Sequence, residues 1–200
     1  MTPTHPLGSP DAALLSAAAS GTPNDVTSAL AAGAHVESRD SHGRSALLLA
    51  VLGDDIKTAQ LLVEHGADPN AVDDRLDTPW LATGTTGSVA MLEVLLSADP
   101  DMSIKNRYGG IAVIPASERG HVEYVRRVVA TGIDVNHVND LGWTALLEAV
   151  ILGDGSAAYQ EIVRILLAAG AVRELADRDG VTAQQHAVRL GHRELAAVLA

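Results

Sequence analysis

Gly132-Ile-Asp-Val-Asn136 and the downstream Gly142-Trp-Thr-Ala-Leu146 decide the fold, because both segments recur along the chain at one spacing. The first begins again at Gly33, Gly66, Asp99 and Gly170, and the second at Gly43, Leu76, Gly109 and Gly180. Successive copies lie 33 residues apart, except that the last step of each series is 38 residues. Self-similarity at such a period indicates a repeat protein in which each unit is covered by its neighbours.

The sequence between these markers has helical periodicity. Residues 46–52 form a short apolar run that predicts one helix, and residues 53–55 interrupt it. A second helix is predicted over residues 56–65, and Gly66 ends it as the glycine that follows a helix. Residues 67–76 are polar and contain Pro69, which is typical of an extended turn. Each unit is therefore predicted to be a helix, a turn, a second helix and a finger-like loop.

This pattern resembles the ankyrin repeat. The matching motifs are Thr78-Pro79-Trp80, Thr144-Ala-Leu146, Gly120-His121, Gly191-His192, Leu61-Leu62, Leu95-Leu96 and Leu166-Leu167. The resemblance covers about residues 11–200, and residues 106–154 further resemble a bacterial subset of ankyrin proteins. It implies an all-α fold, an ankyrin-repeat α-solenoid of about six helix-turn-helix units with extended β-turn fingers.

The expected organisation is a disordered leader over residues 1–10 and one ankyrin repeat domain over residues 11–200. The leader has three prolines and neither a basic segment nor a long apolar segment, so it does not resemble a signal peptide. The units are expected at about residues 11–40, 41–73, 74–106, 107–139, 140–179 and 180–200, and the first and last are expected to act as caps.

The chain departs from the ankyrin motif at three positions. The histidine that usually ties the finger to the helix is replaced by Leu48, Leu81, Ile114, Leu147 and Gln185. Ile111 stands where a threonine usually starts the helix, and Leu76 stands where a glycine is usual. We expect these changes to exchange a polar tie for apolar packing. Trp80, at a leucine position of the motif, is expected in the core.

Composition excludes several classes of function. The net charge is −11, with 25 acidic against 14 basic residues, which disfavours nucleic acid and acidic membranes as partners. The chain has no cysteine, which excludes disulfides and thiolate catalysis. No apolar segment is long enough to span a membrane. We therefore expect a cytoplasmic protein, monomeric by itself.

The resemblance implies that an unidentified protein partner binds a concave surface made of finger tips and first-helix ends. Aromatic, arginine and exposed aliphatic residues are typical of interface hot spots. The candidate partner-binding residues are Arg44, Arg75, Arg107, Tyr108, Glu118, Arg119, Leu141, Trp143, Ile151, Leu152 and Tyr159. Trp143 is predicted either to contact the partner or to pack on the neighbouring finger. The extra residues 153–160 are either a further contact, through Tyr159, or a tolerated insertion.

The sequence contains little that supports catalysis or metal binding. We therefore expect no enzyme activity, catalytic residue, metal site or cofactor. Residues 177–180 imitate the start of a calcium loop but lack its later ligands. Asp73, Asp74, Asp54 and Asp55 are interpreted as turn and capping residues. The favoured function is a protein-interaction module, an adaptor, regulator or inhibitor. A small-ligand or metal-binding receptor is the alternative, followed by a hydrolase built on scattered histidine and aspartate residues.

Overall fold

The computed structural model describes residues 8–200. Contacts divide the chain into an N-terminal body, Met1–Asp101, and a C-terminal body, Met102–Ala200. Residues 1–7 of the expected leader lie outside the described residues. Ser9 already belongs to the fold, because its side chain accepts a hydrogen bond from the Ala12 N–H and caps a helix that begins at Pro10.

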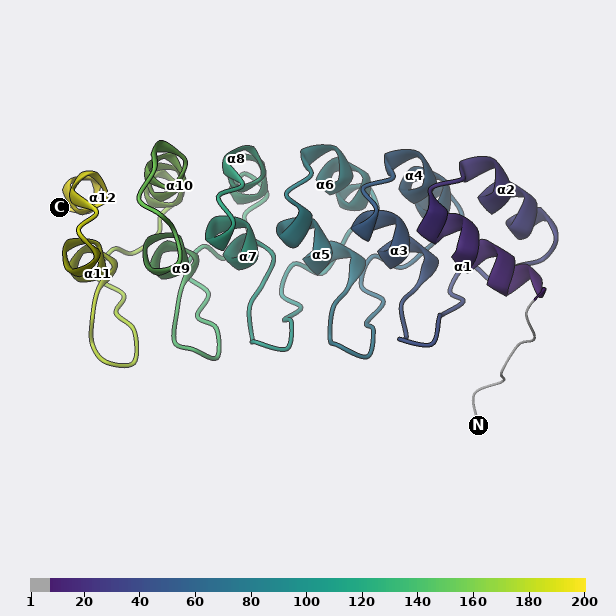
Figure 1. The fold of residues 1–200 in the computed structure, drawn as a ribbon, viewed down its shortest axis with the longest axis horizontal. Coiled ribbons are helices and arrows are strands. Elements are labelled where there is room, and N and C mark those ends of the chain that lie inside the picture. Colours follow the sequence, from purple (N-terminus) through teal and green to yellow (C-terminus); the bar gives the residue numbers. More distant parts are fainter. Residues whose placement is uncertain (1–7) are drawn as a thin grey trace. The chain divides into compact units, whose positions relative to one another are not determined.

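The N-terminal body holds three helix pairs: α1 (Pro10–Ser20) with α2 (Pro23–Ala31), α3 (Ala46–Leu52) with α4 (Ile56–Glu64), and α5 (Pro79–Thr86) with α6 (Val89–Leu96). The first helices of the pairs contact one another in order, α1 with α3 and α3 with α5. The second helices do the same, α2 with α4 and α4 with α6. Figure 1 shows these two layers, with the fingers projecting beside the first helices.

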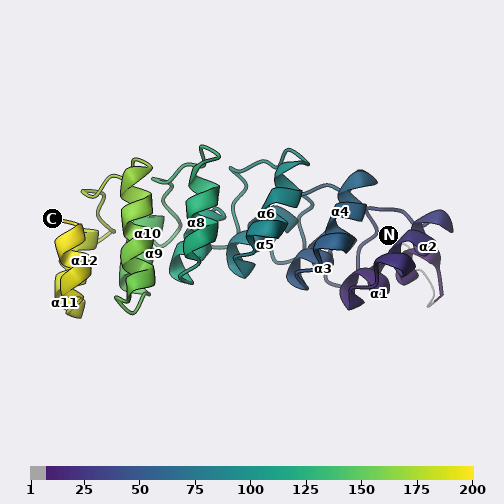
Figure 2. The same ribbon diagram turned by 90° about the horizontal axis from the view of Figure 1, so that it is seen from above.

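The C-terminal body repeats this plan with α7 (Val113–Glu118) and α8 (Val122–Val129), α9 (Ala145–Ile151) and α10 (Ala157–Ala168), and α11 (Ala183–Leu190) and α12 (Arg193–Val198). Helix α9 contacts α7 and α11, and α10 contacts α8 and α12. The view from above shows that α10 runs parallel to α8 and α12 in the outer layer of this body (Figure 2).

Hydroxyl side chains start most of the first helices. Ser45, Thr78, Thr144 and Thr182 each accept a hydrogen bond from the backbone N–H three residues on, at 3.1–3.4 Å. Such N-caps satisfy a helix N–H group that has no partner within the helix. Helix α7 is the exception, because Ile111 replaces the threonine and no side chain caps the helix. It is also one of the two shortest helices among the described residues, with 6 residues.

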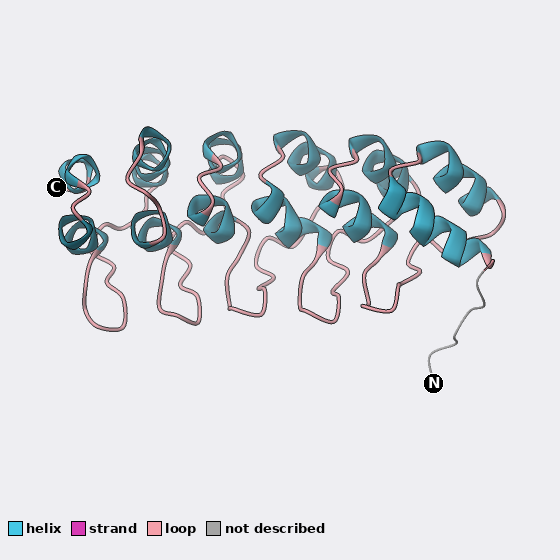
Figure 3. Ribbon diagram, in the orientation of Figure 1, coloured by secondary structure: helices cyan, strands magenta, loops and turns pink. Residues whose placement is uncertain are grey.

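Each of five fingers is shaped by one aspartate or asparagine, at Asp40, Asp73, Asn106, Asn139 and Asp177. The Oδ1 atom of each accepts the backbone N–H groups two and four residues on, at 2.8–3.0 Å. The fingers are loops rather than strands in the described residues (Figure 3), and isolated β-bridges close only the first and the last of them. One side chain therefore fixes each of these turns by hydrogen bonds, as backbone hydrogen bonds between strands do in a hairpin.

The core confirms most of the apolar replacements. Leu48, Leu81, Ile114 and Leu147 are buried, and Trp80 has no exposed surface. Gln185 is different, because it is exposed and its side chain accepts a hydrogen bond from the Thr182 N–H. The prediction of apolar packing is wrong at this one position, where the residue completes a capping box instead.

Candidate binding surface

The N-terminal body contains a cavity of about 290 Å³, and the residues that line it show which repeat positions face one surface. Two neighbouring fingers and the first helices that follow them line it, with His42, Arg44, Leu48, Leu52, Asp73, Arg75, Asp77, Ala82 and Thr85. Finger tips and first-helix ends are therefore brought together, and the candidates Arg44 and Arg75 both line this cavity. Arg75 is exposed.

Arg44 is held within its own finger. Its guanidinium lies 2.7 Å from Asp40 Oδ2 as an ion pair. Burial acts to raise the pKa of Asp40, but hydrogen bonds from the Arg44 side chain and from two backbone N–H groups lower it overall. Arg44 thus stabilises its finger through Asp40 and also lines the cavity.

In the C-terminal body, the exposed candidates gather on two neighbouring fingers. The Asp140 N–H donates to the Tyr108 carbonyl at 2.9 Å, and a nitrogen of His137 lies 2.7 Å from the Gly109 carbonyl oxygen. These bonds bring together Tyr108 and Leu141, whose residues are 55% and 53% exposed. Large apolar side chains this accessible, on adjacent loops, are the typical material of a contact surface.

Arg107 supports the exposed ring of Tyr108. Its guanidinium carbon lies 4.7 Å from the ring centroid, within the range of a cation–π contact. Gly109, next in the chain, has φ +72°, and a Cβ atom there would fall 2.7 Å from Cγ of Asp140. The close approach of the two fingers therefore requires glycine at this turn.

Trp143 and Ile151 are half-buried, whereas Leu152 is 49% exposed at the end of α9. The Trp143 N–H donates to Asn139 Oδ1 at 3.0 Å, which fixes the backbone of its finger. Trp143 is therefore partly accessible, and its role as a partner contact or as packing on the neighbouring finger stays a prediction.

The end of α7 carries the remaining candidates. Glu118 is half-buried and Arg119 is exposed. The Tyr159 hydroxyl donates to the Glu118 carbonyl oxygen at 2.9 Å, and a Cβ on Gly120 would lie 3.4 Å from the Tyr159 ring. Burial, followed by Asp154 and Glu118, raises the pKa of Tyr159. Tyr159 therefore anchors the insertion to the turn between α7 and α8.

The sequence analysis did not identify Glu148, the most unusual ionisable group of this surface. Glu148 is only 6% exposed, and Asn139 Nδ2 donates to its Oε1 at 2.7 Å. Burial and, after it, the charge of Glu118 raise the pKa of Glu148 to about 7, against the opposing effect of the Asn139 hydrogen bond. A carboxylate that is buried beside a second carboxylate is costly to ionise.

A related contact occurs in the last repeat. His186 Nε2 lies 2.6 Å from Asp177 Oδ2, and these two residues are also nine positions apart. We call both contacts finger–helix bonds. They show that the polar tie expected to be missing is present in two repeats, one helix position beyond the motif histidine. The finger aspartates and asparagines recur at the repeat period, which is the signal that could have located them in the sequence.

The finger–helix bond also bears on the alternative chemistries. Asp177 uses Oδ1 for the N–H groups of Asp179 and Val181 and Oδ2 for His186, which gives residues 177–180 a turn-forming role. Across residues 8–200, no group of three or more acidic or histidine side chains is arranged to hold a metal ion. Nor does any helix in that range have the length and apolar character needed to cross a membrane. Asp55 caps α4 as interpreted from the sequence.

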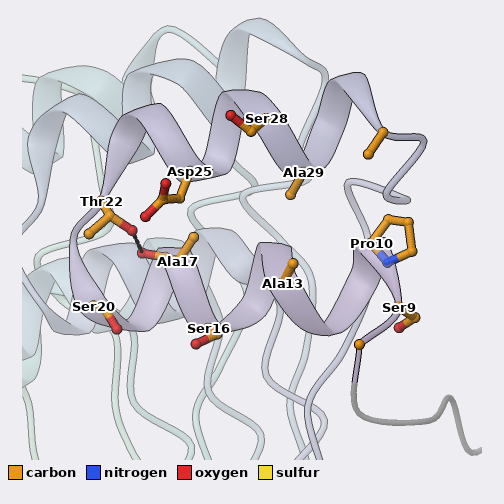
Figure 4. A pocket seen from close by; sticks show the side chains of 12 residues that line it. Ser9, Pro10, Ala13, Ser16, Ala17, Ser20, Thr22, Asp25, Ser28 and Ala29 are labelled. Carbon is orange, nitrogen blue, oxygen red and sulfur yellow. Dashed lines mark hydrogen bonds between the residues drawn. The ribbon is translucent and has the colours of Figure 1, made fainter.

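A second concavity, of about 650 Å³, lies on α1 and α2 (Figure 4). Its lining is mostly alanine and serine, with Asp25 as the charged residue and a hydrogen bond from the Thr22 hydroxyl to the Ala17 carbonyl. The small side chains give a shallow, weakly featured surface with none of the predicted binding residues.

Comparison with known proteins agrees with this architecture. The family model "Ankyrin repeats (3 copies)" matches residues 80–171, and "Ankyrin repeat" matches residues 42–74. YahD, an ankyrin repeat protein of Escherichia coli, is 37% identical over 92% of each chain. A crystal structure of an ankyrin repeat domain from Acinetobacter baumannii AYE is 47% identical, with a TM-score of 0.89 over 93% of this chain and 95% of that one.

A human relative extends the comparison. Cyclin-dependent kinase 4 inhibitor B is 35% identical over 57% of this chain and 83% of its own length. The fold is thus the predicted all-α ankyrin solenoid, and ankyrin repeats are protein-interaction modules. The chain belongs to the ankyrin repeat family.

Proposed function

We propose that this protein is an adaptor, regulator or inhibitor that binds a partner protein through its finger and first-helix surface. The observation that carries the proposal is the exposure of Tyr108 and Leu141 on two fingers joined by the Asp140–Tyr108 backbone hydrogen bond. The name of the human relative, an inhibitor of a protein kinase, supports a role in binding another protein. Family members are interaction scaffolds, which supports the absence of catalysis.

The experiment compares three forms of the full-length chain as affinity baits in lysate of the native host. They are the unchanged chain, the double variant Tyr108→Ala/Leu141→Ala, and the control Val172→Ala, whose residue is 43% exposed on another loop. We expect a specific protein that the unchanged chain and the control retain and that the double variant loses. An identical set of retained proteins for all three baits would contradict the proposal.

The cavity between the fingers of Asp40 and Asp73 favours a small-ligand receptor as the second candidate, because His42, Arg44 and Arg75 could meet an anionic group there. A thermal-shift screen of anionic metabolites tests it. Stabilisation that Arg75→Ala abolishes would support this candidate, and no stabilisation by any anion would exclude it in favour of the protein-binding role.

A further inference from the structure

The residues that line the cavity of the N-terminal body indicate which residues form the equivalent surface in the C-terminal body. Two periods of 33 residues carry its nine lining positions onto Tyr108, Gly110, Ile114, Glu118, Asn139, Leu141, Trp143, Glu148 and Ile151. We call this set the fourth–fifth face. The hydrogen bond between Asn139 and Glu148 joins a finger of this set to α9, and the Asp140–Tyr108 backbone bond joins its two fingers.

The two sets differ in charge. The N-terminal cavity mixes two arginines and a histidine with two aspartates. The charged members of the fourth–fifth face are Glu118 and Glu148, both acidic. The nearby Arg107 and Arg119 are equivalent, two periods earlier, to Ser41 and Gly53, which do not line the N-terminal cavity. The charged side chains of the face itself are therefore all acidic.

The two carboxylates come from different first helices, Glu118 from α7 and Glu148 from α9, which are in contact. The two carboxylates interact electrostatically, because the charge of Glu118, together with burial, raises the pKa of Glu148 to about 7. A cation placed between the two would be attracted by both and would remove their repulsion. Burial around Glu148 strengthens that attraction, since low local polarity reduces screening.

Apolar groups occupy the finger positions of the same face. Tyr108 and Leu141 are exposed, and Trp143 is half-buried in the finger that carries Leu141. Lysine and arginine have long aliphatic stems below their charged ends, and such stems pack along apolar surface while the charge reaches an acidic partner. The combination of an acidic floor with an aromatic and aliphatic border matches that shape and charge.

We infer that the fourth–fifth face docks a segment of a partner protein that presents a lysine or arginine next to an apolar side chain. The basic group lies at Glu118 and Glu148, and the apolar side chain contacts Tyr108 and Leu141. This inference rests on the proposed function and adds to it the chemical class of the partner segment.

The test selects peptides from a random dodecapeptide display library on the full-length chain. Peptides that also bind the Tyr108→Ala/Leu141→Ala variant are removed, so that those remaining depend on the face. We expect them to share a lysine or arginine beside an apolar residue. Calorimetry should then show at least about a tenfold loss of affinity with E118Q/E148Q and no change with the control E194Q, whose residue is exposed on α12.

Two results would overturn the inference in distinguishable ways. Face-dependent peptides that are neutral or acidic, or that bind E118Q/E148Q unchanged, would refute the basic segment but leave the proposed function standing. Failure to obtain any peptide that depends on Tyr108 and Leu141 would count against both. Thermal unfolding verifies the fold of each variant, and E118Q alone provides the charge test if E148Q alters folding.

Discussion

The fifth and sixth repeats use the same finger–helix bond with opposite electrostatic results. In the fifth, Asn139 contacts a buried Glu148, and burial with the charge of Glu118 raises the pKa of that carboxyl. In the sixth, Asp177 contacts His186, and hydrogen bonds from the Val181 N–H and from His186 lower the pKa of Asp177. The geometry of the repeat thus specifies the contact, while the local charges determine whether ionisation is opposed or favoured.

The largest effect is expected from breaking the bond in the fifth repeat with Asn139→Ala. The change leaves the N–H groups of Leu141 and Trp143 without their acceptor and Glu148 without its donor. We expect a loss of about 3 kcal/mol in the free energy of unfolding, measured by urea denaturation at pH 7.

The matched control is Asn106→Ala, because Asn106 accepts the equivalent N–H groups of Tyr108 and Gly110 in its own finger. The residue nine positions after Asn106 is Pro115, whose side chain has no group that could form a finger–helix bond. The control should cost clearly less than Asn139→Ala. Equal losses would show that the contact with Glu148 adds nothing to the finger turn itself.

The next largest effect is expected from Glu148→Gln, which should change how the free energy of unfolding depends on pH. The pKa of Glu148 is raised from 4.5 to about 7 in the folded state, so the folded protein holds a proton that the unfolded chain releases between these values. Its contribution to stability is fully present below pH 4.5 and is lost as pH rises through about 7. Relative to the unchanged chain, E148Q should therefore gain on the order of 2 kcal/mol between pH 5 and pH 8.

Denaturation curves at several pH values measure this gain, with E194Q as the control that should not change it. A stability difference between E148Q and the unchanged chain that is constant across this range would contradict the raised pKa. It would also weaken the contrast between the two repeats.

A smaller effect is expected from Tyr159→Phe, which sharpens the comparison because the fifth repeat carries the insertion. The change removes the hydroxyl that donates to the Glu118 carbonyl and keeps the ring against Gly120. We expect a loss of about 1 kcal/mol in the free energy of unfolding. Tyr108→Phe, at an exposed ring, should leave the stability unchanged; a similar loss in both would refute the anchoring role of Tyr159.

The smallest effect is expected from Asp177→Asn in the sixth repeat. The pKa of Asp177 is lowered from 3.8, so its ionised form stabilises the fold above that pH, and this contribution is lost as pH falls through the folded-state pKa. The unchanged chain should melt slightly higher than the variant at pH 6, and the difference should shrink towards pH 3. A difference that grows as pH falls would reverse the assigned sign.

Much of the fold could be predicted from the sequence, because it depends on residues that are close together along the chain. The repeat period, the helix-starting hydroxyls and the apolar replacements at Leu48 and Leu147 depend on local sequence, and all were accessible before the structure. The missing cap at Ile111 is local in the same sense. Such features need no knowledge of which distant side chains meet.

The charge state of the surface could not be predicted in this way. Glu148 is unusual because α7 brings Glu118 near it and the finger of Asn139 contacts it, and both are consequences of packing between repeats. Tyr159 likewise gained its role from a carbonyl 41 positions away. The candidate residues Arg107, Tyr108, Leu141 and Trp143 remain predictions as partner contacts, although the structure shows how exposed each one is.

The turn-forming aspartates and asparagines separate the shape of a finger from the identity of its tip. Oδ1 of one residue accepts the backbone N–H groups two and four residues on, so the turn depends on backbone atoms of those residues. The side chains two residues on differ from finger to finger, being His42, Arg75, Tyr108, Leu141 and Asp179. New tips could therefore be exchanged into this chain without redesigning the loops that present them. The protein is, in this sense, a ready scaffold for grafting recognition sequences one finger at a time.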